Sequence, residues 1–456
     1  MATTRARRDP MSTRTLITGG VVVPVDPQVE SGPGVDVLID GGRIAAVGRD
    51  LGHVDAERID ATGTVVIPGF VDTHRHTWET VLRGALPATT LDGYLGHLAG
   101  VVGPVFRPQD VYAGTLLGAL EALDAGITTL LDWAHANNTP EHADAGVRAL
   151  TEAGIRAVYA HGTPARGDWW LGSVHPHPAD ARRVRERYFA SDDGLLTFAL
   201  AVRGPGFTTP EVVAADWRLA RDLAARISVH VGMRVTGMRT AAVAELDAAG
   251  LLGPDTTYIH ANTTTDAELD RIAATGGTLS IAPYVEMLMG HGHPPIGRAR
   301  DRGLAPSLSV DVATSVPGDM FTQMRTALAA GRIAQLGDDV DVPFAPDLTH
   351  TGVLEMATRH GAVASGLGDR TGTLTPGKAA DVVLVRADAV NTVPLLDPVA
   401  TVVTSAGTAN VDTVLVGGTV RKRHGRLVGM DLARLRALAE DSRDAVLGGV
   451  PVGASA

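Results

Sequence analysis

Cysteine is absent from this chain of 456 residues. Its absence excludes disulfide bonds and thiolate ligands, so histidine and carboxylate side chains would have to hold any metal ion. Long apolar runs are missing too, since no stretch approaches the roughly 18 to 20 apolar residues of a membrane-spanning helix. The first ten residues carry three arginines without an apolar stretch behind them, which does not fit a secretory signal. We therefore expect a cytoplasmic enzyme without a membrane segment.

Basic residues are in the minority, and the formal net charge is −11. Nucleic acids and acidic membrane surfaces are therefore not expected as partners, whereas a small-molecule substrate is. Aromatic residues make up 4% of the chain, charged residues 20% and hydrophobic residues 45%. This balance is typical of a folded globular protein. The length exceeds what one small core needs, which favours two domains, or one barrel with an appendage.

The two ends of the chain are β-rich, whereas its middle alternates between short apolar strands and longer helices. This pattern predicts an α/β fold, with a (β/α)8 TIM-type barrel and a small β-sandwich domain built from both termini. We assign residues 1–12 to a disordered arm, 13–67 and 372–427 to the β-sandwich, 68–371 to the barrel and 428–456 to a C-terminal helix and tail. The expected barrel strands are 69–73, 128–132, 156–160, 196–202, 227–231, 257–260, 278–282 and 307–311, with helices such as 110–125, 144–153 and 210–225 between them.

The run from Phe70 to His76 reads as a strand that carries two histidines two residues apart. Residues i and i+2 of a strand point to the same face, so His74 and His76 are expected to aim at one spot. Such a pair can supply half of a zinc or iron site. A His-x-His pair on its own is equally consistent with two histidines on the surface of a sheet.

Three further polar residues close apolar strands: His230, His260 and Asp311. A buried imidazole or carboxylate is costly unless it is paired or coordinates a metal, and a single such residue is usually a satisfied core group. Three of them, after a His-x-His pair, favour a site. Reactive groups of a (β/α)8 barrel gather at the carboxyl ends of its strands, where these residues fall.

Two segments resemble a known family. Residues 66–76 and 372–381 are similar to the first-strand signature and the return to the β-domain of the amidohydrolase superfamily, in particular its cytosine deaminase and triazine hydrolase branch. The resemblance implies that one divalent metal, zinc first with iron or manganese also open, is bound by His74, His76, His230 and Asp311. Asp311 would also take a proton from the water that the metal activates, and His260 would contact the substrate or that water. No lysine ends the fourth strand, which favours one metal over two.

The chain departs from that family at one position. Deaminases of this branch carry a glutamate three residues after the fifth-strand histidine, where this chain has Met233. Glu79 and Glu286 are the candidate replacements for a proton-carrying group, although each could equally be a structural carboxylate. The loop with His291 and His293 could be a second metal site, but a lid or surface role is favoured. We expect the pocket to be lined by Trp78, His135, Arg203 and Glu286.

Three functions remain open. The first is a metal-dependent amidohydrolase that acts on a carbon–nitrogen bond of a small cyclic compound, most simply an aminohydrolase that releases ammonia from an N-heterocycle. The second is a hydrolase with the same metal site that opens a cyclic amide or displaces another leaving group. Such a reaction does not need a proton-carrying side chain at position 233, so Met233 is compatible with it. The third is a binding protein without catalysis, although a full set of metal ligands argues against it. A homo-oligomer is also expected to be possible.

Overall fold

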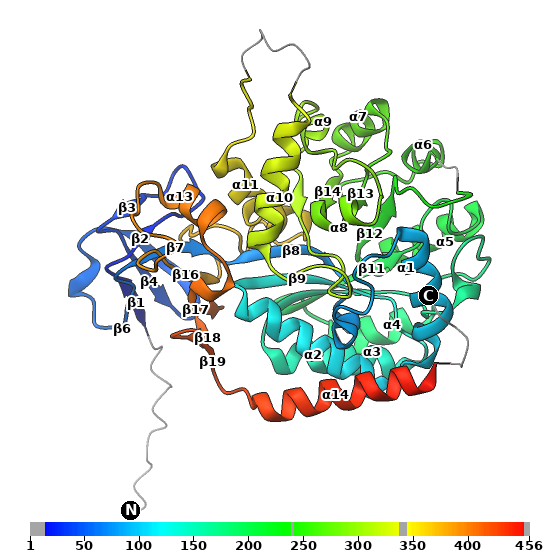
Figure 1. Cartoon of the computed structure of the whole chain (residues 1–456), viewed down its shortest axis with the longest axis horizontal. Coiled ribbons are helices and arrows are strands. Elements are labelled where there is room, and N and C mark those ends of the chain that lie inside the picture. Colours follow the sequence, from blue (N-terminus) through cyan, green and yellow to red (C-terminus); the bar gives the residue numbers. More distant parts are fainter. Residues whose placement is uncertain (1–13, 239–240, 337–343, 451–456) are drawn as a thin grey trace, which may run out of the picture.

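The structure is a computed structural model that describes residues 14–238, 241–336 and 344–450. A barrel forms the larger part, and a smaller β-domain lies to one side of it (Figure 1). The predicted arm of residues 1–12 lies outside the described residues. Within the described ranges, no helix combines the length and the apolar character that crossing a membrane requires.

The barrel consists of eight parallel strands that pair in sequence order. The chain closes the circle where β8 meets the segment after β15, because the backbone N–H of Asp311 donates to His74 O (3.0 Å) and that of His76 donates to Asp311 O (2.9 Å). All eight predicted strands are present. Their bounds are β8 Phe70–Arg75, β9 Ile127–Ala134, β10 Arg156–His161, β11 Leu196–Val202, β12 Arg226–Val231, β13 Thr256–His260, β14 Thr278–Ile281 and β15 Ser307–Leu308.

The last barrel strand is shorter than predicted. Its ladder ends at Leu308, and Asp311 lies beyond it with a φ of 71°. This left-handed conformation takes the residue out of regular strand geometry. The predicted strand of residues 307–311 is therefore corrected to Ser307–Leu308, although Asp311 still lies at the barrel mouth.

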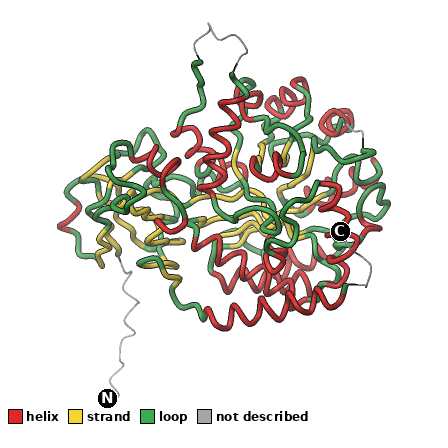
Figure 2. Tube along the Cα trace, viewed as in Figure 1, coloured by secondary structure: helices red, strands yellow, loops and turns green. Residues whose placement is uncertain are grey.

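Helices surround the barrel strands (Figure 2). The strands β9 to β13 are buried along almost their whole length, as expected of parallel strands covered on both faces. A short 3₁₀ segment, η2 (Thr77–Leu82), follows β8. The α-helices are α1 Leu91–His97, α2 Pro108–Asp124, α3 Pro140–Ala153, α4 Asp180–Tyr188, α5 Pro210–Asp222, α6 Ala242–Ala248, α7 Asp266–Ala274, α8 Pro283–Leu288, α9 Ile296–Arg300, α10 Met320–Ile333, α11 His350–Met356, α12 Arg359–Ala364, α13 Pro398–Ala400 and α14 Leu432–Gly449.

The β-domain combines strands from both ends of the chain in two sheets of four and seven strands. At its centre β7 (Thr64–Pro68) pairs with β16 (Val382–Arg386), and buried Val66 and Leu384 help to form its core. The larger sheet is completed by β2 Val21–Val22, β3 Gly32–Pro33, β17 Val411–Val416, β18 Thr419–Arg423 and β19 Arg426–Leu427. The smaller one contains β1 Thr15–Thr18, β4 Asp36–Asp40, β5 Arg43–Gly48 and β6 Glu57–Asp60.

A buried ion pair joins the β-domain to the barrel. Arg156 of β10 donates to both carboxylate oxygens of Asp381, at 2.7 and 3.0 Å. Gly69 separates β7 of the β-domain from β8 of the barrel, and a Cβ at this position would lie 2.0 Å from Thr128 Oγ1. The absence of a side chain thus lets β8 pack closely against β9 where the barrel begins.

Candidate active site

Four side chains from distant parts of the chain converge at the carboxyl end of the barrel. His74 Nε2 lies 3.0 Å from Asp311 Oδ1, His76 Nε2 lies 3.3 Å from the same oxygen, and His230 Nε2 lies 3.2 Å from His74 Nε2. Ligands of a tetrahedral zinc site, with bonds of about 2.0–2.2 Å, lie roughly 3.3–3.6 Å apart. The observed spacings are close to these values, so the four residues fit a metal ion.

The protonation states of these residues also suit a cation. Burial lowers the pKa of His74 to about 3 and holds the pKa of His230 well below its usual value. Burial opposes ionisation of Asp311, but hydrogen bonding to His74 and His76 outweighs it and keeps the pKa of Asp311 well below its usual value. Metal ligands must be neutral imidazoles and ionised carboxylates, and His74, His230 and Asp311 meet this requirement. His76 differs, because burial is outweighed by its hydrogen bond to Asp311 and by the charges of Glu79 and Asp311, which raise its pKa, so a metal ion would have to displace a proton there.

Backbone strain positions two of the side chains. His260 ends β13 with a φ of 72°, and Asp311 has a φ of 71°. A left-handed conformation costs a residue with a side chain of order 1–3 kcal/mol and persists where the surroundings impose it. At both positions the left-handed conformation occurs where the polar side chain reaches the mouth of the barrel.

His260 lies beside these four residues, which we call the metal-ligand cluster, and Glu286 holds its imidazole from the opposite side. Its Nε2 is 3.7 Å from Asp311 Oδ2, and its Nδ1 donates to Glu286 Oε1 at 3.0 Å. Glu286 also accepts from the backbone N–H of Ala282 (2.7 Å) and from Asn262 Nδ2 (3.0 Å). A carboxylate that orients a site histidine in this way fixes its tautomer and its ring plane.

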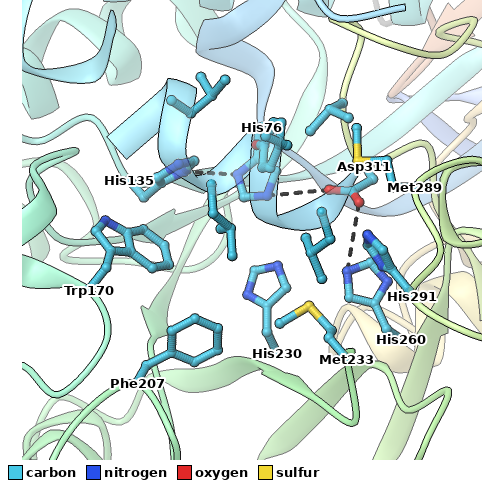
Figure 3. A pocket seen from close by; sticks show the side chains of 15 residues that line it. His76, His135, Trp170, Phe207, His230, Met233, His260, Met289, His291 and Asp311 are labelled. Carbon is cyan, nitrogen blue, oxygen red and sulfur yellow. Dashed lines mark hydrogen bonds and ion pairs between the residues drawn. The ribbon is translucent and has the colours of Figure 1, made fainter. Parts of the chain in front are cut away.

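A cavity of about 520 Å³, a volume that includes its mouth open to solvent, faces this cluster (Figure 3). Apart from the histidines and Asp311, its wall is almost entirely apolar and comes from the loops and short helices that follow the strands. The residues of this wall are Leu91, Tyr94, Leu95, Leu98, Trp170, Phe207, Met233, Met289 and Val312. Met233 thus lines the cavity, and no carboxylate projects from β12 beside it.

The structure brings one of the four predicted pocket residues to this wall. His135 lines the cavity, and its Nδ1 lies 2.9 Å from His76 Nδ1. Trp78 lies behind it and donates its indole N–H to His135 Nδ1 at 3.3 Å. Glu286 lies behind His260, as described above. Neither Trp78 nor Glu286 is part of the wall.

Arg203 follows β11 and is likewise not part of the wall. It is buried and donates to Trp169 O (3.0 Å), Ser173 Oγ (3.0 Å) and His175 O (2.5 Å). These bonds hold the loop that carries Trp170, which does line the cavity. Arg203 is therefore placed to act through this loop.

Glu79 is fully buried in η2, and it too lies behind the wall. Its Oε1 accepts from the Tyr94 hydroxyl at 2.7 Å and lies 3.9 Å from His135 Nε2. Its Oε2 has no hydrogen-bond partner among the described residues. Burial raises the pKa of Glu79 to about 7. Two residues that contact Glu79, Tyr94 and His135, face the cavity.

One buried histidine of the wall was not among the predicted site residues. His291 lines the cavity from the loop between α8 and α9, with its ring centroid 4.7 Å from that of His260. The sequence signal is the pair of histidines around Gly292, for which the loop position predicts a lid or surface role. Nothing in that pattern distinguishes His291 from His293.

Comparison with known proteins identifies relatives along nearly the whole chain. The profile described as "Amidohydrolase family" matches residues 65–421. A 5'-deoxyadenosine deaminase of Methanothermobacter thermautotrophicus is 32% identical over 93% of this chain and 97% of its own. A 5-methylthioadenosine/S-adenosylhomocysteine deaminase of Halobacterium salinarum is 30% identical over 94% and 97%. Atrazine chlorohydrolase of Arthrobacter aurescens, solved with zinc, is similar with a TM-score of 0.80 and 27% identity over 94% of this chain and all of its own.

Proposed function

The chain belongs to the amidohydrolase family, and from this premise we propose that it deaminates the ring of an adenine-type N-heterocycle. The observation that carries the proposal is the convergence of three imidazole nitrogens and one carboxylate oxygen at 3.0–3.3 Å, at the floor of the cavity. The relatives named above as deaminases of 5'-deoxyadenosine and 5-methylthioadenosine support the substrate ring. A site for a divalent metal is part of the fold, and we propose a single zinc ion.

His74, His76, His230 and Asp311 would hold this ion. When bound, a divalent metal acts as a Lewis acid that lowers the pKa of a coordinated water. In our proposal Asp311 accepts the proton of the attacking water. His260, whose Nδ1–H is committed to Glu286, keeps Nε2 directed toward Asp311 and helps to orient the reacting groups.

The leaving amine needs a proton that position 233 cannot supply. We propose that Glu79 supplies it through the side chains in front of it. Tyr94 donates to Glu79 and faces the cavity. When Glu79 is protonated this hydrogen bond can reverse, so that Glu79 donates its proton to the Tyr94 oxygen while the Tyr94 hydroxyl gives its own proton to the substrate. Both oxygens of Glu286 are occupied by protein donors, which supports a positioning role for that residue rather than proton transfer.

The apolar wall suggests what the ring carries. Leu91, Leu95, Leu98, Phe207 and Met289 offer no hydrogen-bonding side chain, so a buried hydroxyl group against them would lose its bonds to water without replacement. An apolar substituent would instead gain from leaving water. We therefore propose a substrate whose substituent is apolar where it meets this wall.

A second candidate follows from Met233. Displacement of a leaving group other than ammonia from a triazine-like ring needs no ring-protonating carboxylate at that position. The similarity to atrazine chlorohydrolase is compatible with this alternative.

Ammonia release tests the two candidates directly. The zinc-loaded enzyme would be assayed with 5'-deoxyadenosine, 5'-methylthioadenosine, adenosine and chloro- and amino-substituted triazines. We expect ammonia from the deoxy and methylthio compounds, and at least tenfold lower kcat/KM for adenosine because of its additional hydroxyl group. Chelation should abolish the activity and zinc should restore it. Release of chloride without any release of ammonia would favour the second candidate over deamination.

A further inference from the structure

The loop between α8 and α9 turns one of its two histidines into the cavity and the other outward. His291 is 1% exposed and lines the cavity, whereas His293 is exposed. Gly292 lies between them with a φ of 137°, and a Cβ there would lie 2.9 Å from Asn262 Cβ. Only glycine suits this backbone and this close approach. The backbone N–H of His291 also donates to Glu286 O at 2.9 Å, so the loop is anchored beside His260.

The imidazole of His291 is buried, and no described residue is its hydrogen-bond partner. Neither Nδ1 nor Nε2 has a hydrogen bond within the described part of the chain. Leaving such a group unsatisfied in the interior is unfavourable, and native proteins rarely do so without a functional reason. Because burial lowers the pKa of His291 to about 3, its ring is neutral at physiological pH and offers one donor and one acceptor.

Two other polar side chains of the cavity wall already contact protein partners. The Tyr94 hydroxyl donates to Glu79, and His135 Nδ1 lies within 2.9–3.3 Å of His76 Nδ1 and Trp78 Nε1. The indole nitrogen of Trp170 also lacks a partner in the described residues, but Trp170 lies across the cavity from His260 (Figure 3). Among the described residues that line the cavity, His291 is therefore the one beside His260 with both ring nitrogens unbonded.

We propose that His291 binds the substrate directly, through a hydrogen bond between its imidazole and a ring nitrogen of the heterocycle. This inference rests on the proposed function, because it assumes that a nitrogen heterocycle binds in the cavity next to the metal-ligand cluster. His291 then provides, from the loop after α8, a polar contact to the ring that Met233 cannot make from the segment after β12. A neutral imidazole matches an uncharged ring, to which it can donate or from which it can accept.

The test compares substitutions within this one loop. His291→Phe removes the polar contact and keeps a ring of similar size, His291→Gln keeps a donor and an acceptor, and His293→Gln is the matched control outside the cavity. We expect kcat/KM for 5'-deoxyadenosine to fall about 10- to 100-fold in His291→Phe and less in His291→Gln. His293→Gln should remain within twofold of the wild type. Zinc content should be unchanged in all three variants, and the melting temperature should not fall, because His291→Phe removes a buried polar group without a partner.

Calorimetric binding of 5'-deoxyadenosine to the zinc-loaded proteins separates this inference from the proposed function. If the wild type binds the nucleoside without releasing ammonia and His291→Phe weakens that binding, deamination fails while the contact stands. If the wild type is an active deaminase and His291→Phe equals it in kcat/KM and affinity, the contact is refuted and deamination stands. Loss of zinc from His291→Phe would also refute the contact, since that loss would show that His291 supports the structure of the metal site. A wild type that neither binds nor deaminates the nucleoside would refute both.

Discussion

At the scale of single residues, Glu286 and Glu79 show why a buried carboxylate cannot be given a role from its type alone. Both are fully buried near the metal-ligand cluster. By residue type alone, either could take over the proton transfer of the glutamate that is absent at position 233. Glu286 accepts from three donors and orients His260. Glu79 contacts Tyr94, and its other oxygen has no partner among the residues that the structure describes. The contacts thus favour positioning for the first and proton transfer for the second.

Glu286→Gln tests the positioning role. A glutamine amide presents an NH₂ group either to Asn262 or to the N–H groups of Ala282 and His260, so one donor will face another donor. We expect His260 to be misoriented and kcat/KM to fall about 10- to 100-fold, while zinc remains bound. Steady-state kinetics and metal analysis of the purified variant measure the two quantities.

His230→Ala is the contrasting variant, because it removes one residue of the metal-ligand cluster itself. Here zinc content and activity should fall together. If Glu286→Gln retained wild-type kinetics, or lost zinc as His230→Ala does, Glu286 would not act through the orientation of His260.

At the scale of elements, the segment after β8 depends on the helix that packs against it. Gly114 of α2 lies against η2, and a Cβ at position 114 would lie 1.9 Å from Trp78 O. This backbone contact cannot relax by a side-chain rotation. The close approach of α2 therefore sets the position of η2, which carries Trp78 and Glu79 directly after His76.

Gly114→Ala should therefore destabilise the protein and disturb the site. We expect the free energy of unfolding to fall by about 1–3 kcal/mol, the usual cost of overpacking, with a measurable loss of kcat/KM. Gly96→Ala in α1 is the control, because a Cβ there meets no atom within 4 Å, and it should be neutral or slightly stabilising. Urea unfolding of both variants decides the matter, and equal stabilities would show that α2 can move away from η2.

At the scale of the whole molecule, buried histidines outside the metal-ligand cluster make the free energy of unfolding depend on pH. His177 is buried with its Nε2 3.0 Å from His161 Nδ1, and Asp180 faces His161 from the other side at 3.6 Å. Asp216 accepts the backbone N–H of His177 at 2.8 Å and forms an ion pair with Arg203 at 3.6 Å. Burial, and then the charges of His161 and Arg203, hold the pKa of His177 well below its usual 6.5.

The sign of the effect follows from this depressed pKa. Below about pH 6.5 the unfolded chain binds a proton at His177 and the folded chain does not, so acid favours unfolding. We expect the wild type to lose more stability than His177→Gln between pH 7.5 and 5.5, by about 1.4 kcal/mol over the whole interval. Urea midpoints of both proteins at the two pH values measure the difference. An identical loss in both would show that His177 is protonated in the folded state.

Much of this architecture was predictable from the sequence by itself. Strands buried on both faces produce apolar runs, and a barrel gathers the residues that end those runs at one mouth, so His230, His260 and Asp311 could be placed beside His74 and His76. The amidohydrolase resemblance is confirmed by the family match over residues 65–421, and with it the class of hydrolases acting on carbon–nitrogen bonds. The roles of single site residues and the oligomeric state stay predictions.

Only the tertiary structure decided which side chains meet the substrate cavity. Trp78, Arg203 and Glu286 were expected on its wall but lie behind it, whereas His291 and the apolar residues of α1 are on it. The physical reason is that loop residues have no periodicity that assigns them a face. Their direction depends on contacts between segments far apart in the chain, such as Arg203 with the loop of residues 169–175, or Gly292 with Asn262.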